Sequence, residues 1–318
     1  MSVSLGDVAA LAKVSKSTVS RYLNDGYVSG DKRERIKAAI DSLGYVANRN
    51  ARLLRSNKLN SIALFVPTVE HPFFSCLADR VEKFLYERGV RMILVSSAGD
   101  IAKEKEMIDM VGEKMVSGCI VVTHNIIPNL PENAPIVTID RHFGPTIPCI
   151  TSDNYEASLR ALEYLYESGC RHIGFIGGRP LVPSEVNARL AAYLDFCRKY
   201  QLMPVYSYET FDHGQEYEVA KAFLQANPNL DSVFCGSDLL AYSVYQLTPK
   251  SLILSRFKII SFDGITEKLF SYVRLTSVAQ DVTALAKMAV EVLLDRLAGK
   301  PTKEKYVIPT RFIRGETA

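Results

Sequence analysis

Hydrophobic residues recur with helical spacing at the start of the chain. Leu5, Val8, Ala9 and Ala12 stand at positions i, i+3, i+4 and i+7, which places them on one face of a helix. Ser4, followed three residues later by an aspartate, supplies a capping-box start for that helix. The pattern predicts a short amphipathic helix with one buried stripe.

Two more helices are predicted before residue 46. The second begins after Ser15, a good N-cap, and runs through Asn24. The third begins at Asp31, which forms a capping box with Glu34, and it ends at Gly44 in a left-handed conformation. Two short helices around a tight turn suit insertion into a DNA major groove, although a plain three-helix domain with a solvated face fits the same pattern. The polar side chains on the exposed face of the second helix are Lys16, Ser17, Ser20, Arg21 and Asn24.

The pattern changes from Ser61 onward, where short apolar runs alternate with longer amphipathic stretches. The apolar runs are residues 62–66, 92–95, 119–122, 136–139, 173–176, 233–235 and 258–262, and the amphipathic stretches are 73–89, 103–116, 154–168, 185–201, 215–226 and 281–298. Continuous apolar strands separated by helices are typical of parallel sheets covered on both faces. The series is long enough for two doubly wound sheets that divide near residues 151–153.

Charge is unevenly distributed along the 318 residues. Residues 1–58 carry 11 Lys/Arg and five acidic residues, a net charge of +6, whereas the rest of the chain carries 27 basic and 30 acidic residues. We call residues 1–58 the head and the rest of the chain the body. A basic head on a mildly acidic body indicates that the head alone has a polyanionic partner. The basic stretch 48–56 is too short to be a stable helix in isolation and is expected to order on a partner, a solvated linker being the alternative.

Composition and motifs argue against several classes of protein. The six cysteines are scattered without metal-ligand spacing, so we expect reduced thiols, a cytoplasmic location, and neither disulfides nor a metal site. No apolar run reaches the ~20 residues of a membrane span, and the N-terminus lacks a signal-peptide pattern. Dinucleotide, phosphate-loop and nucleophile-elbow motifs are also missing from the sequence. We therefore predict a protein that is not an enzyme and needs no cofactor.

Polar and aromatic residues follow the predicted strands of the body. Ligands of parallel sheets bind beyond the carboxyl ends of the strands, so these residues are candidates for a binding site. Carboxylates, a guanidinium and an amide beside aromatic rings match sugar hydroxyls, because each hydroxyl both donates and accepts hydrogen bonds. The candidates are Phe73, Phe74, Asp140, Arg189, Ser237, Asp263 and Gln280, whereas we interpret Asp153 as a helix cap.

The stretches Leu5–Ala12, Val14–Asn24 and Leu43–Tyr45 resemble the LacI/GalR transcription regulators, and the resemblance extends through the whole chain. It implies that Lys16, Ser17 and Arg21 face base edges while Ser15, Ser20 and Asn24 anchor phosphates. It also implies a hinge helix in which Leu54, beside the basic Arg55, wedges between base steps of the minor groove. Lys13 stands where the family usually has glycine, so a left-handed turn there is strained.

The resemblance implies an all-α helix-turn-helix head on an α/β body with two lobes, like periplasmic binding proteins. The expected divisions are residues 1–46 for the helix-turn-helix domain, 47–59 for the hinge and 60–318 for the effector-binding domain with its two lobes. Lobe 1 comprises about 60–151 and 281–302, and lobe 2 comprises about 152–280 and 303–318. In the family, positions matching Phe73, Phe74, Asp140, Arg189, Asp263 and Gln280 line the effector pocket, the position of His213 often holds a covering aromatic, and that of Ser237 is frequently asparagine.

The sequence thus predicts a homodimeric repressor of a carbohydrate operon, with a weak likeness to sucrose- and ribose-type members. Its partners are a pseudo-palindromic operator in double-stranded DNA and a sugar or sugar phosphate bound between the lobes, with no membrane involved. Three alternatives remain: a nucleobase-sensing regulator, a regulator controlled by a partner protein, and a sugar-binding protein without regulatory role.

Overall fold

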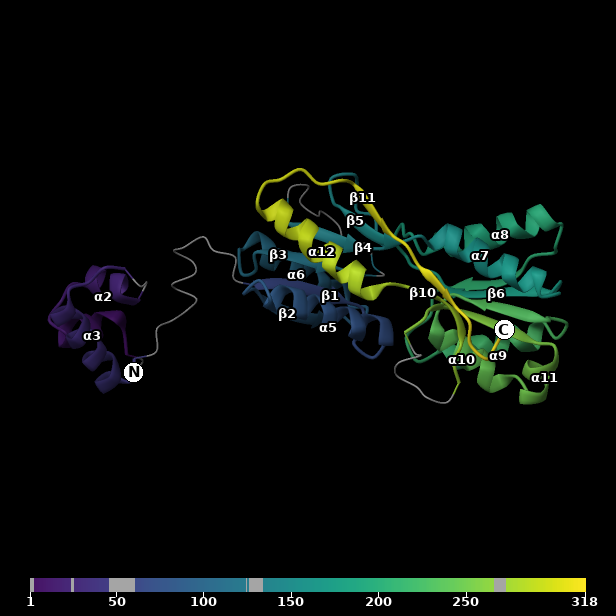
Figure 1. The fold of residues 1–318 in the computed structure, drawn as a ribbon, viewed down its shortest axis with the longest axis horizontal. Helices are drawn as coiled ribbons and strands as arrows, with labels where there is room; N and C mark the ends of the chain where they lie inside the picture. The colour runs from purple at the N-terminus through teal and green to yellow at the C-terminus, as the bar shows by residue number, and fades with distance from the viewer. Residues whose placement is uncertain (1–2, 24–25, 46–60, 124, 126–133, 266–272) are drawn as a thin grey trace. The chain divides into compact units, whose positions relative to one another are not determined.

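The computed structural model describes residues 3–23, 26–45, 61–123, 125, 134–265 and 273–318. The chain divides into two compact units, residues 1–59 and residues 60–318 (Figure 1). Each unit has its own hydrophobic core, so each is described by itself. Within the described residues, no helix has both the length and the apolar composition needed to cross a bilayer.

The described residues of the first unit form three helices, as predicted: α1 (Leu5–Leu11), α2 (Lys16–Leu23) and α3 (Gly30–Leu43). Val8, Val19 and Ile36, one from each helix, are completely buried at the centre of the unit. The core therefore uses the apolar stripes that the sequence pattern predicts.

The ends of these helices test the predicted caps. The capping box between Ser4 and Asp7 is present, and Gly44 ends α3 with a left-handed φ of 59°. Lys13 has a φ of 51°, so the turn before α2 is left-handed at a lysine. The predicted start of α3 is wrong: the helix begins at Gly30, and the Asp31 carboxylate pairs with Arg35 at 3.2 Å instead of capping.

Lobe 1 of the second unit is built on a six-stranded, fully parallel sheet with the order β11-β5-β4-β3-β1-β2. Strands β1, β3, β4 and β5 are buried along their whole length, as expected for a sheet covered on both faces. The strands are β1 (Ser61–Val66), β2 (Arg91–Ser96), β3 (Gly118–Val121), β4 (Ile136–Ile139), β5 (Cys149–Ser152) and β11 (Lys305–Ile308).

Lobe 2 is built on a second six-stranded sheet with the order β12-β10-β9-β8-β6-β7, parallel except for the edge strand β12. Phe175, Phe234 and Phe262, on three adjacent central strands, fill its core. The strands are β6 (Ile173–Gly178), β7 (Val205–Glu209), β8 (Ser232–Cys235), β9 (Lys258–Asp263), β10 (Thr276–Ala279) and β12 (Arg311–Ile313).

Helices flank both sheets, and the chain passes between the lobes three times, after β5, after β10 and after β11 (Figure 1). Lobe 1 has α5 (Pro72–Tyr86), α6 (Ile101–Gly112) and α12 (Val282–Leu297), and α12 packs on α5. Lobe 2 has α7 (Asn154–Glu167), α8 (Asn187–Tyr200), α9 (Glu216–Ala226), α10 (Asp238–Leu247) and α11 (Lys250–Ser255).

One predicted lobe assignment is wrong. The resemblance implied that residues 303–318 lie in lobe 2, but β11 pairs with β5 in the sheet of lobe 1, with Lys305 opposite Cys149. Only from β12 onward does the tail join the second sheet. The tail is thus the third connection between the lobes.

Candidate effector site and DNA-binding surface

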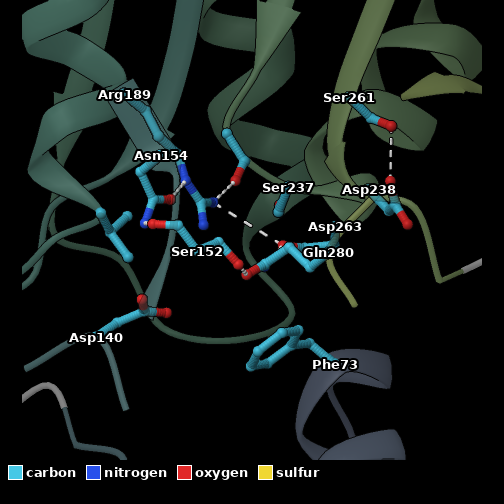
Figure 2. A network of polar contacts seen from close by, with 12 residues as sticks. Phe73, Asp140, Ser152, Asn154, Arg189, Ser237, Asp238, Ser261, Asp263 and Gln280 are labelled. Carbon is cyan, nitrogen blue, oxygen red and sulfur yellow. Dashed lines mark hydrogen bonds and ion pairs between the residues drawn. The ribbon is translucent and has the colours of Figure 1, made fainter. Parts of the chain in front are cut away.

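The candidate site residues of the body come from the carboxyl ends of strands in both sheets. Asp140 directly follows β4, and Ser152 ends β5 in the first sheet. Asp263 ends β9, and Gln280 directly follows β10 in the second sheet. Arg189 lies in the first turn of α8. Because the strands are parallel, their carboxyl ends meet at one edge of each sheet, and these polar side chains are gathered in one place (Figure 2).

Arg189 is at the centre of this polar network, with 5% of the residue exposed. Its Nε donates to Asn154 Oδ1 at 2.7 Å, and its Nη1 donates to the Gly236 carbonyl at 2.7 Å. The same Nη1 lies 3.9 Å from Asp263 Oδ1, and the guanidinium stacks 3.6 Å from the ring centre of Phe262. Burial lowers the pKa of Arg189, while the neighbouring carboxylates of Asp263 and Asp140 favour its charged form.

Asp263 connects this guanidinium to the first lobe through two hydrogen bonds. Gln280 Nε2 donates to Asp263 Oδ1 at 2.8 Å, and Ser152 Oγ donates to Gln280 Oε1 at 2.7 Å. Ser152 belongs to the first sheet and Gln280 to the second, so this chain of contacts bridges the lobes. Burial raises the pKa of Asp263 to about 7, although Arg189 opposes the shift.

Asp140 forms the other end of the network. Thr151 Oγ1 donates to Asp140 Oδ1 at 2.5 Å, and Asn154 Nδ2 donates to Thr151 Oγ1 at 3.0 Å. Asp140 and Asp263 both have positive φ, 59° and 106°. Such backbone strain at non-glycine residues is typical of functional sites, where the surrounding structure must hold it in place.

The ring of Phe73, from α5 of lobe 1, lies beside the network (Figure 2). Phe73 and Phe74 are almost completely buried and contact each other edge to face, with ring centres 5.5 Å apart. His71 caps the helix, because its Nδ1 accepts from the Phe73 N–H at 3.2 Å. Burial, and next the nearby His213, lower the pKa of His71 to about 4.

Two predicted site residues have other interactions. Ser237 Oγ accepts from the Leu240 N–H at 3.3 Å and caps α10. His213 contacts Glu216 through Nδ1 at 3.1 Å, and its ring centre lies 5.9 Å from that of His71. His213 therefore lies beside the helix that carries Phe73, and neither residue hydrogen-bonds to Arg189, Asp263 or Gln280.

Three residues of the network were not on the predicted site list: Thr151, Ser152 and Asn154. All three follow or end β5, so their place at a strand end was the available signal. Asp153 is at the N-cap position of α7, as interpreted, and its carbonyl accepts from the Ala157 N–H at 2.9 Å, but its side chain makes no capping hydrogen bond. Its carboxylate accepts from the Thr310 N–H and from Arg160 Nη2, each at 2.8 Å, and so fixes the tail near the third connection between the lobes.

A second set of contacts between the lobes lies beside Asp140, and we name it the interlobe clasp. It joins residues 140–142 of lobe 1 to residues 183–185 of lobe 2. The Asp140 carbonyl accepts from the Glu185 N–H at 3.0 Å and from Ser184 Oγ at 2.7 Å. The Glu185 carboxylate lies 2.6 Å from His142 Nε2 and accepts from Lys305 Nζ at 2.8 Å. Burial alone would raise the pKa of Glu185, but these two partners outweigh it and the pKa is lowered.

The exposed face of α2 carries the predicted DNA contacts. Ser15 directly precedes the helix, and its Oγ accepts from the Thr18 N–H at 3.2 Å, while Val19 is completely buried on the opposite side. Ser15, Lys16, Ser17 and Arg21 are exposed, and Ser20 is half-buried. The predicted contacts Asn24, Leu54 and Arg55 lie outside the described residues.

Comparison with known proteins agrees with this architecture. Residues 4–48 match bacterial regulatory proteins of the lacI family, and residues 162–318 match a periplasmic binding protein-like domain. A sucrose operon repressor of Streptococcus mutans serotype c is 32% identical over 326 residues, covering 100% of both chains. A ribose operon repressor of Halalkalibacterium halodurans is 30% identical over 318 residues, covering 98% of this chain and 96% of its own.

The fold has a close match among solved structures. The lac repressor dimer bound to operator and the anti-inducer ONPF superimposes with a TM-score of 0.84 at 20% identity, covering 100% of this chain and 99% of its own. The predicted fold class and the resemblance are confirmed, and membership in a family of regulators confirms that the chain is not an enzyme. The chain belongs to the lacI family of bacterial regulatory proteins.

Proposed function

We propose that the chain is a repressor of a carbohydrate-utilisation operon whose operator affinity is controlled by a small sugar bound between the two lobes. The observation that carries this proposal is the buried polar network that joins the carboxyl edges of both sheets. Arg189, Asp263 and Gln280 of lobe 2 are held together by a hydrogen bond and one close ion pair. Hydrogen bonds through Ser152, Asn154 and Thr151 connect them to Asp140 and the sheet of lobe 1. The relatives named sucrose and ribose operon repressors support the same class of ligand.

The head would bind the operator as one half of a homodimer on a pseudo-palindromic site in the cytoplasm. We assign Lys16, Ser17 and Arg21 to base edges and Ser15, Ser20 and Asn24 to phosphates. Leu54 and Arg55 would act in the minor groove. The exposure of Lys16, Ser17 and Arg21 on one helix supports the assignment to bases, because major-groove reading needs side chains that extend from a helix surface.

The mechanism is a coupled equilibrium. Sugar binding to Phe73, Phe74, Asp140, Arg189, Asp263 and Gln280, with Ser237 and His213 at the margin, favours one arrangement of the lobes. The operator favours the other arrangement, so each ligand lowers the affinity for the other by the same factor. The coupling requires only that the two ligands differ in their affinity for the two arrangements.

Fluorescence anisotropy on the full-length protein tests this function. A labelled DNA fragment obtained by selection from random sequence is titrated with protein, and sucrose, fructose, glucose and ribose are then added. We expect sequence-selective binding and release by at least one sugar. DNA binding without sequence preference would contradict the regulator, and binding that no sugar alters would contradict the sugar-controlled repressor.

A further inference from the structure

The polar network has three atoms that make no hydrogen bond or ion pair with the described residues. Arg189 uses Nε and Nη1, Asp140 accepts through Oδ1, and Asp263 accepts through Oδ1. Gln280 is engaged at both ends, as donor to Asp263 and acceptor from Ser152. The atoms that remain are Oδ2 of Asp140, Oδ2 of Asp263 and Nη2 of Arg189. They consist of two acceptors on carboxylates and a single guanidinium donor group.

These atoms specify what a ligand must offer. An ionised carboxylate oxygen accepts only, so Asp140 needs a donor from the ligand, as does Asp263 in its ionised form, whereas Arg189 needs an acceptor. A sugar hydroxyl supplies both functions with one group. A phosphate dianion at neutral pH supplies acceptors only, so it can satisfy Arg189 but neither ionised carboxylate.

The charges around the network also disfavour an anion. Among the described residues of the network and its immediate neighbours, the buried carboxyl groups are those of Asp140, Asp238 and Asp263, and the buried guanidiniums are those of Arg141 and Arg189. Because the pKa of Asp263 is raised to about 7, this carboxyl is only partly ionised at neutral pH, but Asp140 and Asp238 alone balance the two guanidiniums and leave no surplus of positive charge for an anion. Phosphate sites generally offer several free N–H donors from arginine or lysine. Here Arg141 is directed to the Thr123 carbonyl and to Ser184 Oγ, and only one NH₂ of Arg189 stays open. His71 adds no positive charge at neutral pH, because burial lowers its pKa to about 4.

We propose that the effector is an unphosphorylated sugar that donates one hydroxyl to Asp140 and one to Asp263 and accepts from Arg189, and that the two carboxylates exclude sugar phosphates. This inference rests on the proposed function and narrows it. The two aspartates determine specificity by charge, whereas the aromatic rings of Phe73 and Phe74 are indifferent to phosphorylation.

Isothermal titration calorimetry on the full-length protein tests the proposal with matched pairs of ligands. The pairs are fructose and fructose 6-phosphate, glucose and glucose 6-phosphate, and ribose and ribose 5-phosphate, with sucrose added alone. We expect at least one neutral sugar to bind, and its phosphate to bind weaker by a factor on the order of 100, since like charges in a buried site repel strongly. Tighter binding of a phosphate than of its neutral partner would overturn the inference and leave the sugar-controlled repressor standing.

Asp140→Asn tests the role of charge directly. Asparagine keeps the acceptor that Thr151 uses, and it tolerates the left-handed φ of this position. The ratio of the affinity for the neutral sugar to the affinity for its phosphate should fall by about tenfold. Asp263→Asn, an independent variant, should lower the same ratio. Asp109→Asn, an exposed carboxylate on α6, is the matched control and should keep the full preference. An unchanged preference in both site variants would overturn the role of the carboxylates, and failure of every sugar and sugar phosphate to bind would overturn the sugar-controlled repressor together with this inference.

Discussion

At the scale of single residues, Arg189 determines how the network is held together. It contacts Asn154, just beyond the first connection between the lobes, and Gly236, at the end of β8. It also balances part of the charge of Asp263. Asn154 in turn donates to Thr151 of the first sheet, so one buried side chain of lobe 2 is connected to lobe 1 through Asn154.

Arg189→Ala is expected to abolish the response to sugar while leaving operator affinity without sugar unchanged. A buried hydrogen bond to a charged group contributes roughly 1.5–3 kcal/mol, which corresponds to a loss of about 10- to 150-fold in sugar affinity. Titration of the protein–operator complex with sugar measures the response. Arg198→Ala, on the same helix but with an exposed side chain, is the control. A normal response by Arg189→Ala would remove this residue from the site.

Asp263 should make the stability of the body depend on pH. Its pKa is raised from 3.8 to about 7, so between these values the folded state binds more protons than the unfolded state. The free energy of unfolding therefore falls as pH rises through this window. At ~1.4 kcal/mol per pKa unit the effect reaches at most about 4 kcal/mol.

Urea unfolding of wild type and Asp263→Asn at pH 5 and pH 8 measures this contribution. The free energy of unfolding of wild type should fall between pH 5 and pH 8, because Asp263 loses its proton in this range. That of the asparagine variant should fall less, because asparagine has no proton to lose. Asp109→Asn serves again as the control for losing one carboxylate. Equal pH dependence of Asp263→Asn and wild type would be evidence against a raised pKa.

At the scale of elements, the interlobe clasp ties the start of α8 to the loop after β4. Glu185 lies one turn before Arg189, and the carbonyl that Glu185 and Ser184 bind belongs to Asp140. The clasp therefore includes Asp140 of the polar network in lobe 1, and in lobe 2 it lies directly before the helix that carries Arg189. It favours the arrangement in which the network is assembled.

Glu185→Gln is expected to weaken sugar binding by about fivefold. The variant loses the charge that Lys305 neutralises, and a partly exposed ion pair contributes about 1 kcal/mol. Calorimetric titration with the sugar that binds wild type measures the change. Glu163→Gln, which breaks an ion pair with Lys199 inside lobe 2, is the matched control. Equal affinities of Glu185→Gln and wild type for the sugar would show that the clasp does not affect sugar binding.

Periodicity predicted most of the elements that bury a continuous apolar run or stripe, but it missed α10, which buries Leu240, Ala241 and Val244, and it missed strands decided by pairing. The strand β7 is half exposed at an edge, and β11 shows only one fully buried residue, Ile308, so neither has the apolar run of a central strand. The site shows the same limit. Asp140, Asp263 and Gln280 could be named as candidates from strand ends, and Arg189 from the start of a helix beyond a strand, but Ser152 and Asn154 join the network only through partners 128 and 35 residues away.

At the scale of the whole molecule, charge is divided between the two units. The first 58 residues have a net charge of +6, and the remaining 260 have a net charge of −3. DNA attracts the head and repels the body, so nonspecific binding should depend on the head and decrease with salt. Specific binding needs contacts that charge alone does not supply.

Leu54 is where we expect one such contact, although it lies outside the described residues. It stands beside Leu53 in a basic stretch, and neighbouring residues of a helix point about 100° apart, so the two cannot share one narrow apolar face. Insertion between base steps gives Leu54 a buried environment and offsets part of an unstacking cost of a few kcal/mol. Two dimer-related leucines would act at the operator centre, where a pyrimidine–purine step such as C-G opens most easily.

Leu54→Ala should therefore lose both operator bending and specific affinity, while binding to any DNA at low salt persists because every charge is kept. Gel mobility of circularly permuted operator fragments measures the bend, and anisotropy in low salt measures the nonspecific affinity. Leu53→Ala is the matched control, since it removes the same apolar surface from the adjacent position and should bend the operator normally. If Leu54→Ala bends the operator as strongly as wild type does, Leu54 belongs to a linker and the bend must come from other residues.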